Sequence, residues 1–294
     1  MNHAVIVAAG LVSVLATTAL VIGEEKTHEP LGATPPTAAS QAPADKPGWR
    51  LTFHDEFDGP KLDEAKWFGR YRAGRPGREG ILANYVINDG ILHLRVDEKL
   101  PFRSAVHGQV TTSIQTSDML RRPDGVYVAD NKFAQKYGWF EVRCRTVSGS
   151  GLCSTFWLLQ TDPYDQEYTI DGKARHLGDG VVEIDIFEQL GRDAALHQSQ
   201  FNVHFTQSGH IIYDLGFDPS IDFHTYALEW KEGELIWYAD GNEIWRYTGG
   251  TPQKEMLVFL GLYQGTGWIG EVPENTVYPK DYEIDYIRVY QRLP

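Results

Sequence analysis

The stretch Val182-Glu183-Ile184-Asp185-Ile186-Phe187-Glu188 decides how the rest of the sequence is interpreted. Its alternation of β-branched and acidic residues predicts a β-strand. Side chains on a strand point alternately to its two faces, so Glu183 and Asp185 share one face. Glu188 would fall on the opposite face of a regular strand, but a β-bulge near Ile186-Phe187 would return it to the acidic face and turn Phe187 away. The stretch therefore predicts three carboxylates on one wall of a sheet.

Three carboxylates in this spacing suit the hydrolysis of a glycosidic bond. One carboxylate attacks the anomeric carbon and one carboxylic acid protonates the leaving oxygen, and in a retaining enzyme the two lie about 5 Å apart. Glu183 and Glu188 would meet this requirement across the bulge. The charge of Asp185 between them would raise the pKa of the acid and keep it protonated near neutral pH. The alternative is a solvent-exposed acidic strand face, because short acidic patterns are common.

The segment Glu183–Glu188 resembles the bulged E-I-D-x-x-E signature of family 16 glycoside hydrolases, the group of laminarinases, agarases and carrageenases. Six further segments resemble the family in its own order: Phe53–Gly59, Tyr137–Arg143, Phe156–Leu159, Phe223–Tyr226, Trp237–Gly241 and Asp285–Gln291. The resemblance implies that Glu183 is the nucleophile, Asp185 the assisting acid and Glu188 the general acid/base. It also implies a concanavalin A-like β-jelly roll with a concave substrate cleft.

The remainder of the chain indicates an all-β fold. Short alternating runs are separated by turn residues, and long helical periodicity is missing from the sequence. Tyr85–Asn88 and Ile91–Val96 flank Asp89-Gly90, a favoured hairpin turn. Val142–Thr146 and Leu152–Leu159 flank a Ser/Gly turn, which predicts a second hairpin. Many short strands without helical crossovers predict an antiparallel β-sandwich.

The two cysteines of the chain, Cys144 and Cys153, fall on the two arms of the predicted second hairpin. In an oxidising compartment they would be able to form a disulfide. Cross-strand geometry is restrictive, however, so two free thiols in the core are the equal alternative.

The N-terminal part of the sequence divides into two segments before the folded domain. Residues 1–23 are apolar and carry no Lys, Arg, Asp or Glu, which predicts a secretory signal peptide. The missing positive charges make an uncleaved membrane anchor the second interpretation. Residues 24–47 are rich in Pro, Ala and Thr and predict a disordered linker. The catalytic domain is then 48–294, and we expect it to be secreted, periplasmic or otherwise outside the cell, or else held there by the anchor.

The formal net charge of −13 argues against nucleic acid as a partner, because phosphates require a basic surface. It also disfavours a polyanionic substrate mildly, since a local basic patch can override a global sum. A polysaccharide is the expected partner of the chain, which we expect to be a monomer.

Three residues outside the acidic stretch are candidates for substrate binding. Trp157 precedes the acidic strand, and Trp268 lies among glycines in Gly265–Gly270, where a core role is harder to explain. His204 lies on the strand predicted to follow the acidic one, where a neutral imidazole would hydrogen-bond a carboxylate or a sugar hydroxyl. The alternative for each is a structural role.

No cofactor is expected for catalysis. The sequence lacks the spacing of a zinc site. The family resemblance implies a structural Ca²⁺, with Glu56, Gly90 and Asp285 at the matching positions, and oxygen-only ligands suit this ion. The same acids would alternatively form salt bridges.

The predicted function is that of a retaining endo-glycosidase acting on a β-linked polysaccharide. The first substrate is a β-1,3- or β-1,3-1,4-glucan, in agreement with the Trp within Gly261–Gly270 and the acidic charge. Many β-glucanases have Trp-Pro-Ala where this chain has Cys153-Ser154-Thr155, a segment that looks more like those of agarases and porphyranases. A galactan of agar, porphyran or carrageenan type is therefore the second candidate substrate. A transglycosylase is a third possibility, and a lectin-like module without catalysis is the alternative from another class.

Overall fold

The computed structural model describes residues 45–71, 82–98, 110–121, 127–161, 182–205, 207–265 and 267–294. The predicted signal peptide or anchor and all of the predicted linker except residues 45–47 lie outside these ranges. The predictions for residues 1–23 and 24–47 therefore stay predictions. Among the described residues, no helix has both the length and the apolar character that a membrane crossing would need.

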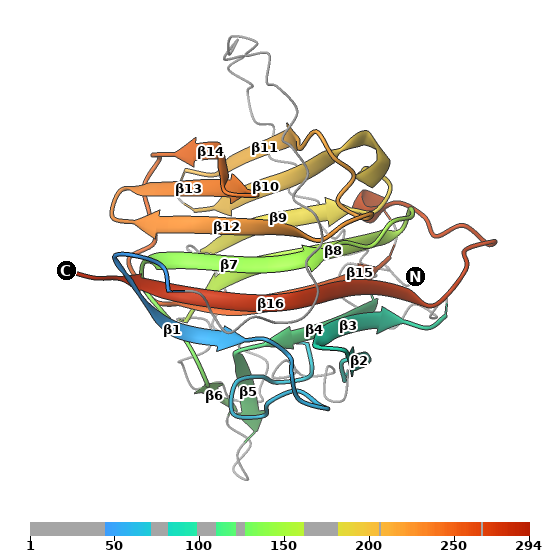
Figure 1. Cartoon of the computed structure of the whole chain (residues 1–294), viewed down its shortest axis with the longest axis horizontal. Coiled ribbons are helices and arrows are strands. Elements are labelled where there is room, and N and C mark those ends of the chain that lie inside the picture. The colour runs from blue at the N-terminus through green and yellow to red at the C-terminus, as the bar shows by residue number, and fades with distance from the viewer. Residues whose placement is uncertain are drawn as a thin grey trace, which may run out of the picture. The chain divides into compact units, whose positions relative to one another are not determined.

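Two large antiparallel sheets and one small sheet make up the described structure (Figure 1). The eight-stranded sheet has the order β14 (Asn242–Tyr247), β13 (Glu234–Ala239), β12 (His224–Lys231), β7 (Gly138–Arg145), β16 (Lys280–Arg292), β3 (Ile91–Val96) and β2 (Tyr85–Asn88), and β1 (Trp49–Asp55) also pairs with β16. The six-stranded sheet has the order β11 (Gly209–Asp214), β10 (Gln198–His204), β9 (Glu183–Leu190), β8 (Leu152–Gln160), β15 (Met256–Gln264) and β4 (Val110–Gln115). The small sheet pairs β5 (Ser117–Arg121) with β6 (Tyr127–Asn131), and two short 3₁₀ helices, η1 (Ala194–Leu196) and η2 (Gly267–Ile269), complete the elements.

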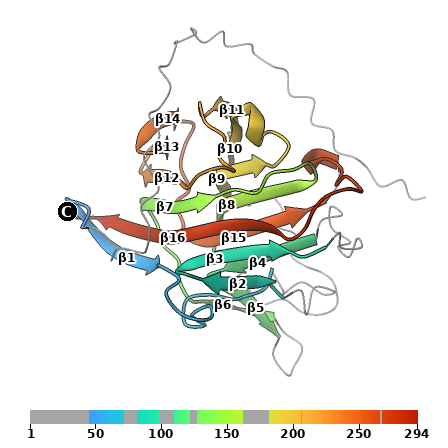
Figure 2. The same ribbon diagram turned by 45° about the vertical axis from the view of Figure 1, so that its right-hand side comes forward.

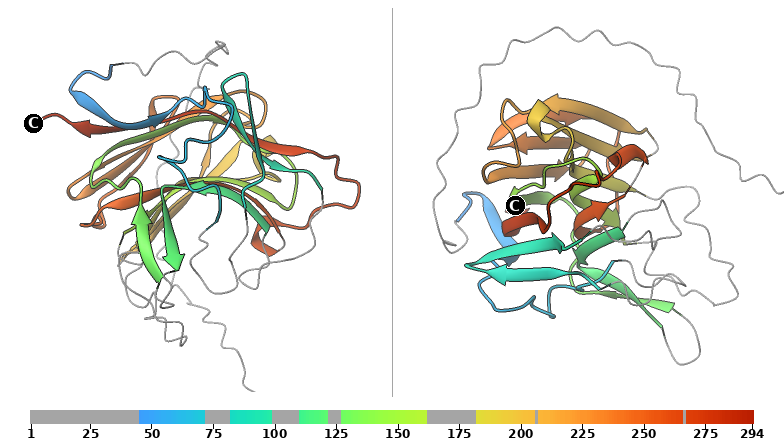
Figure 3. Two further views of the ribbon diagram at one scale, coloured as in Figure 1. Left: turned by 90° about the horizontal axis from the view of Figure 1, so that it is seen from below. Right: turned by 90° about the vertical axis from the view of Figure 1, so that its right-hand side faces the viewer.

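The two large sheets pack face to face as the layers of a sandwich (Figures 2 and 3). One core cluster contains buried side chains of both layers, among them Phe140 and Leu228 of the eight-stranded sheet and Phe156 and Ile184 of the six-stranded sheet. Burial of each such side chain contributes about 1.5–3 kcal/mol to folding. The predicted all-β antiparallel sandwich is therefore confirmed.

Strands β8 and β15 are buried along almost their whole length, whereas β3 alternates between buried and partly exposed residues. The difference arises on the outer face of the six-stranded sheet. There Trp157 and Leu159 of β8 pack with Leu257 and Phe259 of β15, and Tyr71 packs against this cluster. The outer face next to β9 is therefore partly covered by other segments of the chain.

The first predicted hairpin is present, and the second is not. β2 pairs with β3 around Asp89 and Gly90, which both have positive φ as a tight hairpin turn requires. β7, however, pairs with β12 and β16, while β8 pairs with β9 and β15. The segment between β7 and β8 thus crosses from one layer to the other. Cys144 and Cys153 consequently lie in different sheets, and both are buried and free, so the disulfide alternative is wrong.

Candidate active site

The acidic strand β9 carries the predicted bulge. Asp185 lies opposite Asn202 of β10, and Glu188 lies opposite Gln200, so a step of three residues on β9 matches a step of two on β10. The register against β8 shifts at the same place. Phe187 is fully buried and packs on Tyr226 in the core. Glu188 therefore shares the outer face of β9 with Glu183 and Asp185, and we call this the acidic face.

A tryptophan of the opposite sheet supports the bulge from the core side. The indole nitrogen of Trp237, on β13, donates a hydrogen bond of 3.1 Å to the main-chain oxygen of Asp185. A bulge disrupts the regular ladder and leaves main-chain groups in need of other partners. An unpaired buried carbonyl would cost about 1–3 kcal/mol, so this bond stabilises the local geometry that brings the acids together.

Burial and mutual repulsion shape the protonation of the acidic face. Burial, and then the charge of Glu183, raises the pKa of Asp185 well above its usual value. Burial raises the pKa of Glu188 in the same way, with further contributions from the charges of Asp185 and Glu183. Like charges held close together in a poorly solvated site cannot all ionise. Glu188 is thus suited to hold a proton near neutral pH and to donate it.

Two polar side chains of β10 meet these carboxylates. His204 places its Nε2 atom 3.3 Å from Asp185 Oδ2 and 3.9 Å from Glu183 Oε1. One side-chain oxygen or nitrogen atom from each of these three residues lies within 4.8 Å of those from the other two. Asn202 donates a hydrogen bond of 2.5 Å from Nδ2 to Glu188 Oε2. His204 therefore lies beside the carboxylates, but Asp185 Oδ2 has no hydrogen-bond partner among the described residues, and the hydrogen-bonding role of His204 stays a prediction.

Asn202 and its neighbour His210 are site residues that sequence reasoning missed. Asn202 lies two residues before His204 on the same strand and so shares its face, a signal that was available in the sequence. His210, on β11, lies directly opposite Asn202, and its Nδ1 atom hydrogen-bonds Asn202 Oδ1. The contact between His210 and Asn202 becomes visible only from the register between β10 and β11.

The two predicted tryptophans differ in exposure. Trp157 is 5% exposed and its ring stacks on Phe259 at a centroid distance of 4.2 Å, so it offers little surface to a sugar. Trp268 lies on η2 and is 46% exposed, while Ile269 beside it is buried. Of the two, only Trp268 presents a substantial aromatic surface.

The acids matched to a calcium site form ion pairs in this structure. Both carboxylate oxygens of Glu56 accept hydrogen bonds from Arg288, at 3.0 and 2.7 Å. Asp285 accepts one of 2.5 Å from Arg143, and Gly90 belongs to the turn between β2 and β3. Guanidinium groups therefore already neutralise both acids. These contacts are the salt bridges that the sequence offered as the alternative, and the calcium site stays a prediction.

Comparisons with known proteins agree with this geometry. The sequence profile of the family described as Glycosyl hydrolases family 16 matches residues 108–288. The chain belongs to this family. The "Beta-glucanase" of Brevibacillus brevis is 27% identical over 223 residues, which cover 74% of this chain and 74% of that protein. In three further relatives with glucanase names the match covers between 20% and 42% of their own length.

Solved structures share the fold over most of this chain. The laminarinase catalytic domain of Thermotoga maritima MSB8 has a TM-score of 0.63 and 25% identity, over 84% of this chain and 99% of that one. A GlcNAcα1-4Gal-releasing endo-β-galactosidase of Clostridium perfringens has a TM-score of 0.73 and 24% identity, over 86% of this chain and 66% of that one. The family membership makes this chain a glycoside hydrolase of a retaining family that needs no cofactor for catalysis. The predicted family, jelly-roll fold and enzyme class are therefore confirmed.

Proposed function

We propose that this protein is a retaining endo-glycosidase that hydrolyses internal linkages of a β-1,3- or β-1,3-1,4-glucan. The observation that carries the proposal is the bulge of β9, which brings Glu183, Asp185 and Glu188 to one face. The raised pKa of Glu188 supports its role as the acid. The glucanase names of the relatives support the choice of substrate.

The reaction follows from the positions of the three acids. In the first half-reaction a Glu183 carboxylate oxygen bonds to the anomeric carbon while the glycosidic bond breaks, and Glu188 gives its proton to the leaving oxygen. In the second, the Glu188 carboxylate takes a proton from water as the water oxygen attacks the same carbon and Glu183 leaves. Asp185 influences the protonation of Glu188 through its charge.

Two residues are assigned to substrate binding. Trp268 is our candidate for a stacking platform, because its exposed ring would pack on the apolar face of a sugar unit. His204 is our candidate for a contact to a sugar hydroxyl or for orienting Asp185, since its side chain is about half exposed beside the carboxylates.

A galactan is the second candidate substrate. Thr155 lies opposite Glu188 in register, within the Cys153-Ser154-Thr155 segment that resembles agarases. The Clostridium perfringens endo-β-galactosidase shares the fold. Its 24% identity limits the likeness to the fold, so the glucan remains our first choice.

The experiment measures reducing-sugar release from a panel containing β-1,3-glucan, mixed-linkage β-glucan, agar, porphyran and carrageenan. We expect turnover of a glucan by the wild-type chain and loss of that turnover in Glu183→Ala. Release from the galactans alone would replace the glucan with the second candidate. Binding of the polysaccharides without turnover would support a lectin-like module, and a product of inverted anomeric configuration would exclude the glycosyl-enzyme intermediate.

We further infer that the enzyme is a monomer that works outside the cell, either released or anchored by residues 1–23. The apolar, uncharged character of that segment supports the location outside the cell. Fractionation of the producing cells with N-terminal sequencing of the product would distinguish cleavage from anchoring, and light scattering would give the oligomeric state.

A further inference from the structure

Asn202 is a buried amide aimed at a carboxylate that must change its charge during the reaction. The residue is 6% exposed, and its NH₂ group donates to Glu188 Oε2 at 2.5 Å. A hydrogen bond donated to a carboxyl oxygen favours the ionised form over the protonated form. Asn202 therefore opposes the effects of burial and of the neighbouring acids on Glu188.

His210 fixes which end of the Asn202 amide faces Glu188. The two residues are paired directly across β10 and β11, and His210 Nδ1 hydrogen-bonds Asn202 Oδ1. An amide oxygen can only accept, so the imidazole must donate through an Nδ1–H group. Burial, and then the charge of His204, lowers the pKa of His210, yet both the neutral Nδ1–H tautomer and the imidazolium supply this donor. The NH₂ group of Asn202 is thereby kept toward Glu188.

The groups that face Glu188 fall into two opposing sets. Asp185 and Glu183, on its own strand, favour its protonated form, whereas His204 and Asn202, on β10, favour the carboxylate. On its other side, β8 places the uncharged Thr155 opposite it. Asn202 is thus the uncharged member of the set that offsets the two acids.

We propose that Asn202, oriented by His210, is a positioning residue that stabilises the carboxylate form of Glu188 for the second half-reaction. This inference rests on the proposed function. The first half-reaction needs Glu188 with its proton, and the surrounding acids already provide for that. The second needs the carboxylate, which must take a proton from water while the C1–O bond to Glu183 breaks. Loss of the Asn202 hydrogen bond would therefore slow breakdown of the glycosyl-enzyme more than its formation.

The first test compares wild type with Asn202→Ala on two kinds of substrate. With an aryl glycoside whose leaving group needs no protonation, we expect a burst of phenol and a steady-state rate about 10- to 100-fold lower at pH 7, because base catalysis typically contributes 10²–10⁴-fold. With the polysaccharide, we expect the basic limb of the kcat/KM profile to move upward by about one pH unit, since that limb reports the pKa of Glu188 in the free enzyme.

Gln189 supplies the matched control. It is a buried amide next to Glu188 on β9, and its Nε2 atom donates to the main-chain oxygens of Leu190 and Gln198. Gln189→Ala should perturb the pairing of β9 with β10 and lower the melting temperature, but leave the basic limb in place. An equal limb shift in Gln189→Ala would reduce Asn202 to a structural role and overturn the inference.

His210→Phe is the second variant, and it keeps the inference testable if Asn202→Ala does not fold. We expect an upward shift of the basic limb smaller than that of Asn202→Ala. The double variant should shift no further than Asn202→Ala alone, because the two residues act in series. An unchanged limb in a folded Asn202→Ala or His210→Phe enzyme would overturn the inference while leaving the proposed function intact. A wild-type chain that cleaves nothing on the panel would instead overturn the proposed function.

Discussion

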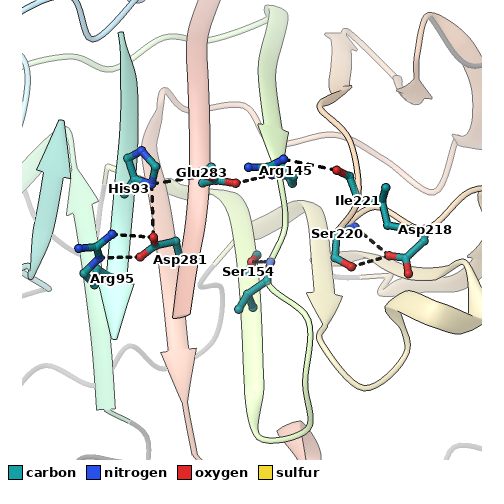
Figure 4. Close-up of polar contacts among 10 residues, drawn as sticks. His93, Arg95, Arg145, Ser154, Asp218, Ser220, Ile221, Asp281 and Glu283 are labelled. Atoms are coloured by element: carbon teal, nitrogen blue, oxygen red, sulfur yellow. Dashed lines mark hydrogen bonds and ion pairs between the residues drawn. The ribbon is translucent and has the colours of Figure 1, made fainter. Parts of the chain in front are cut away.

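The two large sheets carry acidic residues on their outer faces, but in opposite electrostatic surroundings. On the eight-stranded sheet, five side chains form a row in which basic and acidic residue types alternate, and we call it the charge ladder: Arg95, Asp281, His93, Glu283 and Arg145 (Figure 4). Arg95 donates two hydrogen bonds of 2.8 Å to Asp281. Burial alone would raise the pKa of Asp281, but the hydrogen bonds from Arg95 and the neighbouring His93, 3.4 Å away, outweigh burial and lower it to about 2.

On the acidic face of the six-stranded sheet, the nearest charged neighbours of each carboxylate include other carboxylates. The pKa values of Asp185 and Glu188 are raised there, chiefly by burial and then by the adjacent acids. Asp281 is therefore held as a stable anion on one sheet, whereas Asp185 and Glu188 are exchangeable acids on the other. The comparison shows that the partners of an acid distinguish a reactive site from a structural ion pair.

The largest expected difference in kcat/KM is between two variants that each replace one glutamate, one on the acidic face and one in the charge ladder. Glu188→Gln should lower kcat/KM on the polysaccharide by about 10²- to 10⁴-fold, because the amide cannot donate the proton that the leaving group needs. Glu283→Gln, in the charge ladder, should change kcat/KM by less than about twofold, since a surface substitution away from the reacting atoms leaves the site intact. Steady-state kinetics on both variants checks this, and equal losses would show that the two faces do not differ in function.

Removal of the middle acid should sharpen the electrostatic part of the comparison. Asp185→Asn keeps the shape of the side chain but removes a negative charge that raises the pKa of Glu188. The pKa of Glu188 should fall, so the basic limb of the kcat/KM profile should move to lower pH by about one unit. We also expect kcat to fall by about 10- to 100-fold. A basic limb that stays in place would mean that Asp185 carries no charge in the free enzyme.

Two buried tryptophans of the eight-stranded sheet test whether the bulge needs its support from the core. Trp237→Phe loses the hydrogen bond to the Asp185 carbonyl. We expect this loss to lower the free energy of unfolding by about 1–2 kcal/mol, in addition to the effect of the smaller ring. We also expect a roughly 10-fold fall in kcat. Trp230→Phe is the control, because the Trp230 indole nitrogen has no hydrogen-bond partner among the described residues.

Denaturant unfolding and kcat should be measured on both tryptophan variants. Trp230→Phe should lose stability through the cavity alone and keep its kcat when assayed well below its unfolding transition. A fall in kcat of the same size in both variants would mean that core packing in general, and not the bond to Asp185, maintains the acidic face.

The smallest expected effect is on the stability contributed by the charge ladder. The pKa of Asp281 is lowered from 3.8 to about 2, so its stabilisation is present above about pH 4 and is lost as the pH falls toward 2. After allowance for solvent screening we expect about 1 kcal/mol. Asp281→Asn should therefore unfold more easily in urea at pH 7, match the wild type near pH 2 and keep its kcat. A difference that persists at pH 2 would point to lost packing instead of lost charge.

Part of this structure could be predicted because the signals are local. The alternation in Val182–Glu188 and the spacing of its acids define a strand face and require a bulge. Asp89-Gly90 between two alternating runs predicts its hairpin turn in the same way. Each of these features depends on residues close together in the chain.

Other features depended on distant residues, and the second predicted hairpin failed for that reason. The hairpin around residues 148–151 is absent because β7 and β8 find their partners in different layers. The ion pairs of the two acids are also long-range, because Glu56 meets Arg288, 232 residues away, and Asp285 meets Arg143. A sequence shows that an acid is present, but the strand register decides which cation reaches it.

By itself the sequence determined that three carboxylates share one face of a strand. Side chains on a strand alternate between its two faces with a period of two residues, and the extra residue of the bulge returns Glu188 to the face of Glu183 and Asp185. Only the tertiary structure decided what surrounds them: Asn202 beside Glu188, His210 behind Asn202, and Trp237 beneath the bulge. These contacts join β9, β10, β11 and β13, whose side-by-side pairing and stacking follow from the long-range register of two sheets. The charge on each acid is set by such neighbours, and so its chemistry becomes visible only in the folded chain.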